Sequence, residues 1–265
     1  MDLQLKGRTA LVTGSTAGIG RAIARSLAAE GATVLVNGRS AARVDAVVAE
    51  LRADVGPEAS LIAAPGDLGG AEGCAALIEA HPDVDILVNN LGIFEPKAFE
   101  DIPDADWLRF FEVNVMSGVR LSRHYLPRMK AAGWGRVVFI SSESGLCPPA
   151  EMVHYGMSKT AQIAVARGMA ETTTGTGVTV NSVLPGPTGT EGVGAFFDEL
   201  ARNAGVSRED FVDRFFRDAR PTSINRRLAD PAEVAAVVAF VCSPLSSAIN
   251  GAAVRAEGGV VRCIG

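Results

Sequence analysis

Tyr155 and Lys159 are the residues of this chain whose types and spacing are best suited to proton transfer. In a helix, side chains four positions apart lie one turn apart on the same face, close enough to interact. The chain contains only one other tyrosine, Tyr125, and Ser142 follows the apolar run 137–140. We interpret Tyr155 as a proton-donating acid, Lys159 as the group that tunes it and Ser142 as the residue that orients a substrate. Taken alone, the Tyr/Lys pair would also fit an ordinary surface helix.

The ordinary pKa of tyrosine, about 10, makes it a poor acid and base near neutral pH. Lowering that pKa by about two to three units requires roughly 3–4 kcal/mol of preference for the phenolate. One ammonium about 4 Å away supplies this energy at an effective dielectric constant near 20. We therefore expect Lys159 to point at Tyr155 and lower its pKa, and Ser142 to donate a hydrogen bond to the same substrate oxygen. Strand alternation places Ser141 on the opposite face, and Ser144 is a third, less well placed serine.

A glycine-rich turn between a predicted strand and a predicted helix indicates a phosphate-binding loop. Residues 8–13 are expected to form a buried strand, residues 14–20 the turn, and a helix ends near Gly31 before a second strand at 33–37. Such a unit has a right-handed crossover and parallel strands. The glycines let a pyrophosphate approach backbone N–H groups at a helix N-terminus, where its negative charge is stabilised.

The alternation of strands and helices continues and predicts an α/β fold. Further helices are expected at 42–51, 72–80, 103–130, 152–172 and 230–242, and further strands at 60–64, 86–89, 136–141, 178–184 and 252–256. The last helix carries a capping box from Asp230 to Glu233. The pattern predicts a Rossmann-type doubly wound parallel sheet with helices on both faces, in a single domain spanning 1–265.

The stretch 191–227 interrupts this alternation. It contains two apparent short helices, around 195–203 and 209–217, each with an apolar face. Long excursions at the carboxyl ends of strands tend to cover ligand sites. We interpret the stretch as a substrate lid, the alternative being a helical hairpin packed on the rim. Five of its arginines, one of which is Arg220, could attract an anionic substrate, but we expect most of them to be solvated.

Composition and charge exclude several classes of protein. With 265 residues, 48% of them hydrophobic, the chain is expected to be globular. Its net charge of −5 argues against a nucleic-acid partner, and no apolar run approaches the roughly 18 residues that span a bilayer. The sequence shows no signal-peptide pattern, its four cysteines are scattered, and its histidines lack the spacing of metal ligands. We expect a cytoplasmic protein without a membrane, nucleic-acid or metal partner.

The chain resembles the short-chain dehydrogenase/reductase family in its single-domain, β-ketoacyl-carrier-protein-reductase-like form. The matching motifs are Thr13-Gly14-x-x-x-Gly18-Ile19-Gly20, Asp67-Leu68, Asn89-Asn90-Leu91-Gly92, Asn114, Ser142, Tyr155-x-x-x-Lys159 and Asn181-x-Val183-x-Pro185-Gly186-x-x-x-Thr190. They occur in order along nearly the whole chain, and at these spacings their combination is highly specific. Leu91 departs from the family, which usually has alanine there.

The resemblance implies a nicotinamide dinucleotide cofactor. Its binding residues would be Gly14, Ser15, Thr16, Gly18, Ile19, Gly20, Arg39, Asp67, Leu68, Asn90, Gly92, Tyr155, Lys159, Pro185, Gly186 and Thr190. The glycine turn would hold the phosphates, Asp67 would border the adenine, and 185–190 would border the nicotinamide. Asp67 could instead cap a helix, and 185–186 could form a plain turn.

The resemblance also gives Asn114 a role, as the residue that holds a water linking Lys159 to solvent. Asparagine is a poor helix former, and Asn114 lies in the middle of a predicted helix. The alternative is a structural amide bonded to a neighbouring strand. His154 is interpreted as a structural or pocket-rim residue, because successive helical residues point apart.

The end of the second strand favours NADP(H) over NAD(H). Enzymes that select NAD usually place an acidic residue there to bind the ribose 2′-hydroxyl. Here 37–40 contains Arg39 and no carboxylate, and an arginine can stack on adenine and pair with a 2′-phosphate. Arg39 could also be a solvated loop residue, and Thr16 stands where NADP-preferring relatives often carry a basic residue.

These observations predict an NADP(H)-dependent oxidoreductase that interconverts a carbonyl and a secondary alcohol, with Asn114, Ser142, Tyr155 and Lys159 as its catalytic set. An NAD-dependent alcohol or sugar-alcohol dehydrogenase and a non-catalytic cofactor-sensing protein are the alternatives. The family resemblance implies a homotetramer formed through the helices containing Asn114 and Tyr155. The substrate does not follow from the sequence beyond a small carbonyl or alcohol in an apolar pocket.

Overall fold

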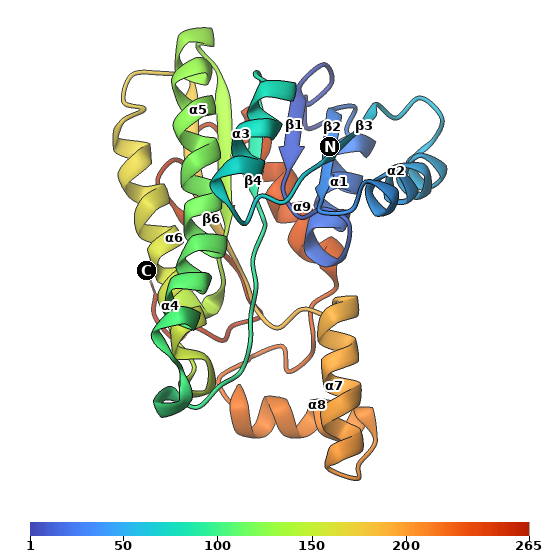
Figure 1. The fold of residues 1–265 in the computed structure, drawn as a ribbon, viewed down its shortest axis with the longest axis vertical. Helices are drawn as coiled ribbons and strands as arrows, with labels where there is room; N and C mark the ends of the chain where they lie inside the picture. Colours follow the sequence, from blue (N-terminus) through green and yellow to red (C-terminus); the bar gives the residue numbers. More distant parts are fainter. Residues whose placement is uncertain (265) are drawn as a thin grey trace.

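Seven parallel strands form the central layer of the protein, which the computed structural model describes over residues 1–264 (Figure 1). The strands are β1 (Thr9–Val12), β2 (Thr33–Gly38), β3 (Leu61–Pro65), β4 (Ile86–Asn89), β5 (Gly135–Ile140), β6 (Val178–Pro185) and β7 (Ala253–Ala256). Their spatial order is β3-β2-β1-β4-β5-β6-β7, and every neighbouring pair is parallel. The direction of winding reverses between β1 and β4, which confirms the predicted doubly wound sheet.

Helices cover both faces of the sheet, as predicted. They are α1 (Gly18–Ala29), α2 (Ala41–Val55), α3 (Ala71–Ala80), α4 (Asp104–Phe110), α5 (Ser117–Ala132), α6 (Val153–Glu171), α7 (Glu191–Asn203), α8 (Arg208–Arg214) and α9 (Pro231–Cys242). Helices α1, α2 and α9 contribute to one hydrophobic core, and α3, α5 and α6 contribute to the other. No helix within residues 1–264 is both long and apolar enough to cross a bilayer.

The strands supply side chains to both cores in alternation. In β5, Val138 and Ile140 belong to the core under α1 and α9, whereas Val137 and Phe139 belong to the core under α5 and α6. Successive side chains of a strand point to opposite faces, so a strand covered on both faces is apolar throughout. This is why the strands appear in the sequence as short continuous apolar runs and not as alternating ones.

The helix expected at 103–130 is not one continuous α-helix. A π-helical turn, Phe111–Met116, separates α4 from α5. Asn114 lies in this turn and is fully buried. A π-helical turn inserts one extra residue into the helical repeat and is common at functional sites. The apolar periodicity on either side of the turn hides this interruption in the sequence.

The stretch 191–227 forms α7, α8 and a second π-helical turn, Phe215–Ala219, which lie beyond the end of the sheet (Figure 1). The predicted helix at 195–203 begins earlier, at Glu191, because the Thr190 hydroxyl accepts a hydrogen bond from Val193 N–H at 3.2 Å. Phe197 packs against Phe211 at a ring-centroid distance of 5.3 Å. The apolar faces of the two helices therefore pack against each other.

Helix α9 begins with the capping box that the sequence predicts. The Asp230 carboxylate accepts from Ala232 N–H at 2.8 Å, and the Glu233 carboxylate accepts from Asp230 N–H at 2.7 Å. Arg227 also binds Glu233, and together these hydrogen bonds lower the pKa of that carboxyl to about 2. The cap fixes where the chain leaves the stretch 191–227 and enters α9.

The packing of α5 on the sheet can be tested by substituting two glycines that lie in helices. A Cβ at Gly118 would lie 2.6 Å from the Phe139 ring, whereas a Cβ at Gly168 in α6 would meet nothing within 4 Å. Gly118→Ala should lower the free energy of unfolding by about 1–3 kcal/mol. Gly168→Ala should raise it by up to about 1 kcal/mol, because alanine favours a helix. Denaturant unfolding of both variants checks this, and equal effects would contradict the packing described.

Candidate active site

A cavity of about 720 Å³ opens at the carboxyl ends of β1, β4, β5 and β6, between the sheet and helices α7 and α8. Twelve of the predicted site residues line it, namely Gly14, Gly18, Ile19, Gly20, Asn90, Gly92, Ser142, Tyr155, Lys159, Pro185, Gly186 and Thr190. The other predicted residues, Ser15, Thr16, Arg39, Asp67, Leu68 and Asn114, are not part of its lining. Carboxyl ends of parallel strands meet at one edge of a sheet, which explains why residues so far apart in sequence converge here.

The glycine turn presents the N-terminus of α1 to this cavity. Gly14 and Gly18 have φ values of 60° and 53°, in the left-handed region that favours glycine. No side chain caps α1 at Ala17, and its first turn contains no acidic residue. Instead, the Gly18 N–H donates to the carboxylate of Glu191, from α7, at 2.9 Å. An anion therefore already occupies this helix end, and the donor groups fit a phosphate.

Two polar side chains, Ser15 and Asn90, hold the glycine turn in shape. The Ser15 hydroxyl donates to Val12 O at 2.7 Å and accepts from Asn37 N–H at 2.9 Å. Asn90 donates from Nδ2 to Thr13 O at 2.9 Å and to Gly14 O at 3.1 Å. Through these hydrogen bonds, the side chains of Ser15 and Asn90 stabilise the conformation of the loop.

Two arginines lie beside this turn at the end of β2. Arg39 is exposed, and Arg43 in the first turn of α2 donates from Nη2 to Thr16 O at 3.3 Å. The sequence interpretation missed Arg43, although its position four residues after Arg39 was a usable signal. Asp67 does not cap a helix, because α3 begins at Ala71 with Gly70 as its N-cap.

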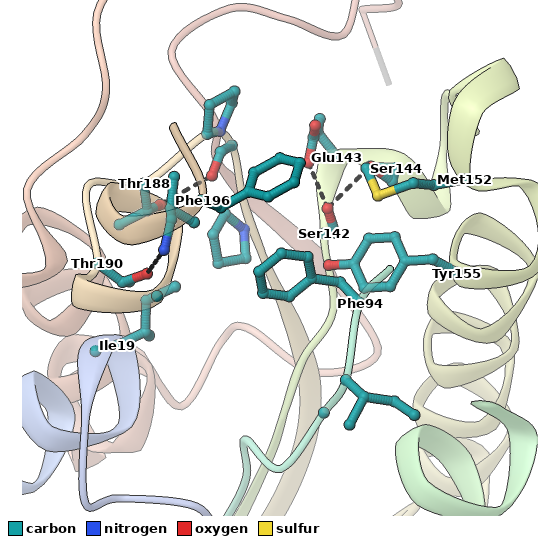
Figure 2. Close-up of a pocket in the computed structure, with 18 of the residues that line it drawn as sticks. Ile19, Phe94, Ser142, Glu143, Ser144, Met152, Tyr155, Thr188, Thr190 and Phe196 are labelled. Atoms are coloured by element: carbon teal, nitrogen blue, oxygen red, sulfur yellow. Dashed lines mark hydrogen bonds between the residues drawn. The ribbon is translucent and has the colours of Figure 1, made fainter. Parts of the chain in front are cut away.

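Ser142 and Tyr155 lie together at the inner end of the cavity, with Phe94 and Phe196 nearby (Figure 2). Ser142 follows β5, and its hydroxyl accepts from Ser144 N–H at 3.1 Å and donates to the Glu143 carboxylate. Burial and the charge of Glu143 hold the pKa of Tyr155 above its usual value, against a smaller opposing effect of the neighbouring Ser142 hydroxyl.

Lys159 is buried, and its ammonium does not point at the tyrosine hydroxyl. Nζ donates to Ile140 O at 2.9 Å and to Gln162 Oε1 at 3.1 Å, and it lies 5.6 Å from the centre of the Tyr155 ring. Burial lowers the pKa of Lys159 to about 8, against the opposing effect of Glu143. The predicted lowering of the Tyr155 pKa by Lys159 is therefore not found in this structure, because the ammonium is directed to other acceptors.

The side-chain amide of Asn114 forms hydrogen bonds with other groups of the protein. Its Oδ1 accepts from Ile93 N–H at 2.8 Å, and its Nδ2 donates to Ile93 O at 3.0 Å and to Ser158 Oγ at 2.9 Å. Gln162 Nε2 donates to the Asn114 carbonyl oxygen at 2.6 Å. The amide thus anchors the segment after β4, as in the structural alternative, and Gln162 connects the Asn114 carbonyl to Lys159. Gln162 was not predicted, because only the fold brings it between these two groups.

Two neighbouring residues have structural roles. Ser141 donates to Lys159 O at 2.8 Å and lines the same cavity as Ser142. His154 is fully buried against Phe110, at 4.1 Å between ring centroids, and its ring nitrogens have no hydrogen-bond partner within residues 1–264. His154 is not part of the cavity lining, so the structural interpretation holds and the pocket-rim one does not.

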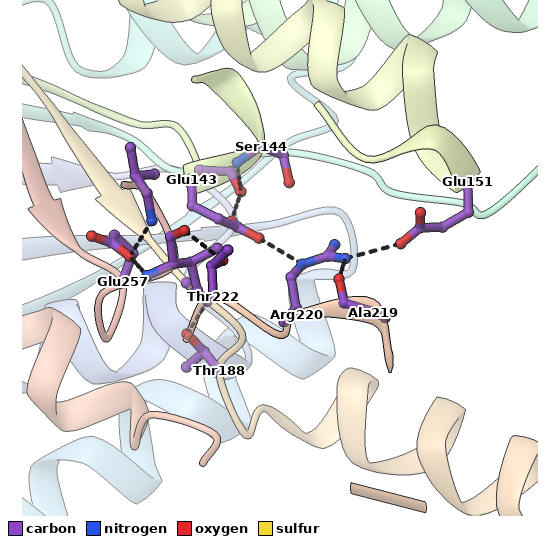
Figure 3. Close-up of polar contacts among 12 residues, drawn as sticks. Glu143, Ser144, Glu151, Thr188, Ala219, Arg220, Thr222 and Glu257 are labelled. Atoms are coloured by element: carbon purple, nitrogen blue, oxygen red, sulfur yellow. Dashed lines mark hydrogen bonds and ion pairs between the residues drawn. The ribbon is translucent and has the colours of Figure 1, made fainter. Parts of the chain in front are cut away.

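A buried ion-pair cluster at the cavity was missed by the sequence interpretation. Arg220 belongs to the group of arginines of which most are expected to be solvated, but it is only 8% exposed. Its Nε lies 3.4 Å from Glu143 Oε1, and its Nη1 lies 3.1 Å from Glu151 Oε1 (Figure 3). All three residues line the cavity. Arg220 therefore joins the segment after α8 to the loop that follows Ser142.

Comparison with known proteins identifies relatives along the whole chain. The family model described as short chain dehydrogenase matches residues 8–213. The chain is 54% identical over 264 residues to the uncharacterized oxidoreductase YvaG of Bacillus subtilis, covering all of both chains. It is 34% identical over 265 residues to the 3-oxoacyl-[acyl-carrier-protein] reductase FabG of Aquifex aeolicus, covering 98% of this chain and all of that one.

Solved structures share the fold. L-sorbose reductase from Gluconobacter frateurii, complexed with NADPH and L-sorbose, matches with a TM-score of 0.93 at 27% identity over all of both chains. A putative NAD(P)-dependent gluconate 5-dehydrogenase from Beutenbergia cavernae with bound NADP matches with a TM-score of 0.84 at 32% identity, covering 98% of this chain and 99% of that one. The ordered motifs, the sheet topology and these matches agree, and the chain belongs to the short-chain dehydrogenase/reductase family of oxidoreductases.

Proposed function

We propose that the protein is an NADP(H)-dependent oxidoreductase that interconverts a carbonyl and a secondary alcohol, with Tyr155 as the acid and base. The observation that carries this proposal is the placement of the Tyr155 and Ser142 hydroxyl groups together in a cavity that also contains the glycine turn. A substrate oxygen between the two hydroxyls would be held by both. The cavity is large enough for a small carbonyl compound beside a nicotinamide ring.

The residues around the turn fit a dinucleotide phosphate. The Gly18 N–H group already binds the Glu191 carboxylate, and Gly14 and Gly20 lie in the same lining. Pro185, Gly186 and Thr190 would hold the nicotinamide end. When bound, the cofactor supplies or accepts the hydride.

The chain's own residues handle the proton. In reduction, the carbonyl carbon gains a hydride, the C=O double bond becomes a single bond, and Tyr155 gives its hydroxyl proton to the oxygen. Ser142 orients that oxygen, and Lys159 contributes a positive charge that stabilises the phenolate left behind. Because burial and Glu143 raise the pKa of Tyr155, the tyrosine is protonated at neutral pH, as proton donation in reduction requires, and it is a weaker acid than an exposed tyrosine.

Arg39 and Arg43 support NADP(H) as the preferred cofactor, with NAD(H) as the alternative. Two guanidinium groups beside the turn, without a carboxylate at the end of β2, suit a 2′-phosphate better than a free hydroxyl. The NADPH of the L-sorbose reductase structure and the NADP of the Beutenbergia cavernae structure are consistent with this choice.

The stretch 191–227 is proposed as a substrate lid, because Phe196, Phe215 and Arg220 from it line the cavity.

A homotetramer is proposed from exposed apolar side chains around α4, where Leu108 is 70% exposed and Phe111 is 40% exposed. Large apolar side chains exposed together favour burial against another copy of the chain. Light scattering of the purified protein measures its oligomeric state, and a stable monomer would exclude the homotetramer.

The proposed acid gives a matched pair of tyrosine variants. Tyr155→Phe should lower kcat for ketone reduction by about 10³-fold or more, with NADPH binding retained. Tyr125→Phe is the control, because that hydroxyl is bonded to His81 O at 2.7 Å outside the cavity. It should leave kcat unchanged and reduce stability by about 1 kcal/mol. Steady-state NADPH oxidation and thermal unfolding measure both, and similar kcat values for the two variants would contradict the assignment.

The cofactor preference can be tested at Arg39. Arg39→Leu should weaken NADPH binding by about tenfold or more and NADH binding much less, because NADH offers the guanidinium an adenine to stack on but no 2′-phosphate to pair with. Arg128→Leu, which breaks an exposed ion pair with Asp83, serves as the control. Fluorescence titration with both cofactors gives the dissociation constants. Tighter binding of NADH than of NADPH by the unaltered protein would refute the preference.

The buried lysine predicts a pH dependence. Lys159 is charged below its pKa of about 8 and neutral above it, while the raised pKa of Tyr155 keeps the phenol neutral over this range. The kcat/KM for reduction, which reports groups of the free enzyme, should therefore fall above about pH 8. Gln162→Leu removes an acceptor of the ammonium and should move this fall to lower pH. A flat profile up to about pH 9.5 in the unaltered enzyme would contradict the role of Lys159.

A further inference from the structure

We propose that Glu143 and Arg220 bind a hydroxyl group of the substrate beside its reacting carbonyl, so that the enzyme accepts neutral hydroxy ketones in preference to keto acids. This inference rests on the proposed function, because it concerns the substrate of the same cavity. It adds a second polar contact to the one made by Ser142 and Tyr155.

The position of Glu143 supports the proposal. Glu143 directly follows Ser142, and its carboxylate accepts the Ser142 hydroxyl proton. Ser142, Glu143 and Tyr155 line the same cavity (Figure 2). A substrate whose carbonyl oxygen lies between Ser142 and Tyr155 therefore places the carbon next to that carbonyl close to the Glu143 carboxylate.

Glu143 and Arg220 can each form further hydrogen bonds. Each carboxylate oxygen can accept two hydrogen bonds. Glu143 Oε2 accepts from Ser142, and Oε1 faces Arg220 Nε at 3.4 Å, which is long for a charged hydrogen bond. Arg220 Nη2 has no hydrogen-bond partner among residues 1–264, whereas Nη1 binds Glu151 and Ala219 O. An acceptor and a donor are thus available together, and a hydroxyl group satisfies both at once.

The charge of the cluster disfavours an anionic substrate. Glu143 and Glu151 both face the single guanidinium of Arg220, so the cluster carries one negative charge in excess, with Glu143 and Arg220 buried and the Glu151 side chain about half exposed. The other nearby cation, Lys159, is directed to Ile140 O and Gln162. A substrate carboxylate placed beside Glu143 would meet like charge in a buried site, where such repulsion is poorly screened. A neutral hydroxyl avoids this repulsion.

Apolar side chains also line the cavity. Phe94, Phe196 and Met152 lie around Tyr155 and Ser142 (Figure 2). These side chains provide van der Waals contact for the carbon chain of a substrate and no partner for a second charged group. The arrangement therefore suits a molecule with one polar end, carrying the carbonyl and its neighbouring hydroxyl.

The first test is the substrate preference of the unaltered enzyme. Hydroxyacetone, acetone and pyruvate differ only in the group beside the carbonyl, and the same three end groups on a longer alkyl chain form a second series. The kcat/KM for NADPH-dependent reduction should be about 10- to 100-fold higher for the hydroxy ketone than for the plain ketone. The keto acid should be reduced more slowly than the hydroxy ketone in both series.

The second test assigns the preference to the two residues. Glu143→Gln keeps the size and removes the charge, so it should lower the hydroxy-ketone to keto-acid ratio by about tenfold, mainly through KM. Arg220→Met should lower the hydroxy-ketone to plain-ketone ratio by a similar factor. Glu171→Gln, which breaks an exposed pair with Arg167, should change neither ratio. Thermal unfolding and NADPH binding establish that each variant is folded.

The outcomes separate this inference from the proposed function. Equal kcat/KM values for the three end groups in the unaltered enzyme, within about threefold, would overturn the inference alone. The inference would also be overturned if both variants changed the kcat/KM values of all three substrates by the same factor. If Glu143→Gln does not fold, the substrate preferences of the unaltered enzyme and of Arg220→Met still test the inference. Failure to reduce any ketone despite NADPH binding would overturn the proposed function, and this inference with it.

Discussion

A positive charge buried at the end of β5 is the constraint on which the site depends. Removing an ammonium from water disfavours its charged form, and the pKa of Lys159 accordingly falls to about 8. Ile140 O and Gln162 Oε1 keep the ammonium hydrogen-bonded. Gln162 in turn binds the Asn114 carbonyl in the π-helical turn. The charge is therefore tolerated only because a strand, helix α6 and the interrupted helix meet around it.

A second set of charges connects the stretch 191–227 to Ser142 and Tyr155. Ser142 lies between Tyr155 and Glu143, and Glu143 lies between Ser142 and Arg220. Arg220 enters from the segment that follows α8, and Glu191 at the start of α7 holds the Gly18 N–H of the glycine turn. The stretch 191–227 thus contacts both the glycine turn and the loop that follows Ser142. Movement of this stretch would change both contacts together.

Much of the fold could be predicted because its signals are local. Short apolar runs, the glycine turn and the Asp230–Glu233 cap each depend on neighbours in sequence, and the structure confirms them. The convergence of Ser142, Tyr155 and the glycine turn at one sheet edge follows from parallel topology, which the alternation of helices and strands already indicates.

The remaining features depend on contacts that sequence spacing does not reveal. Glu143 and Arg220 are 77 positions apart, and nothing in the sequence distinguishes Arg220 from the solvated arginines near it. The π-helical turn at Asn114 is invisible because apolar periodicity continues on both sides of it. The direction of the Lys159 side chain was also mispredicted, since the i,i+4 spacing places it near Tyr155 but does not show that Gln162 and Ile140 O accept its hydrogen bonds.

The proposed function requires that a hydride pass between a nicotinamide and a carbonyl carbon in this cavity. This transfer can be followed with NADPH that carries deuterium at its transferable position, mixed with the protein and a hydroxy ketone, and with mass spectrometry of the product. We expect a diol with one deuterium on the carbon that was the carbonyl. NADPH that binds while no deuterated alcohol forms from any ketone would contradict it.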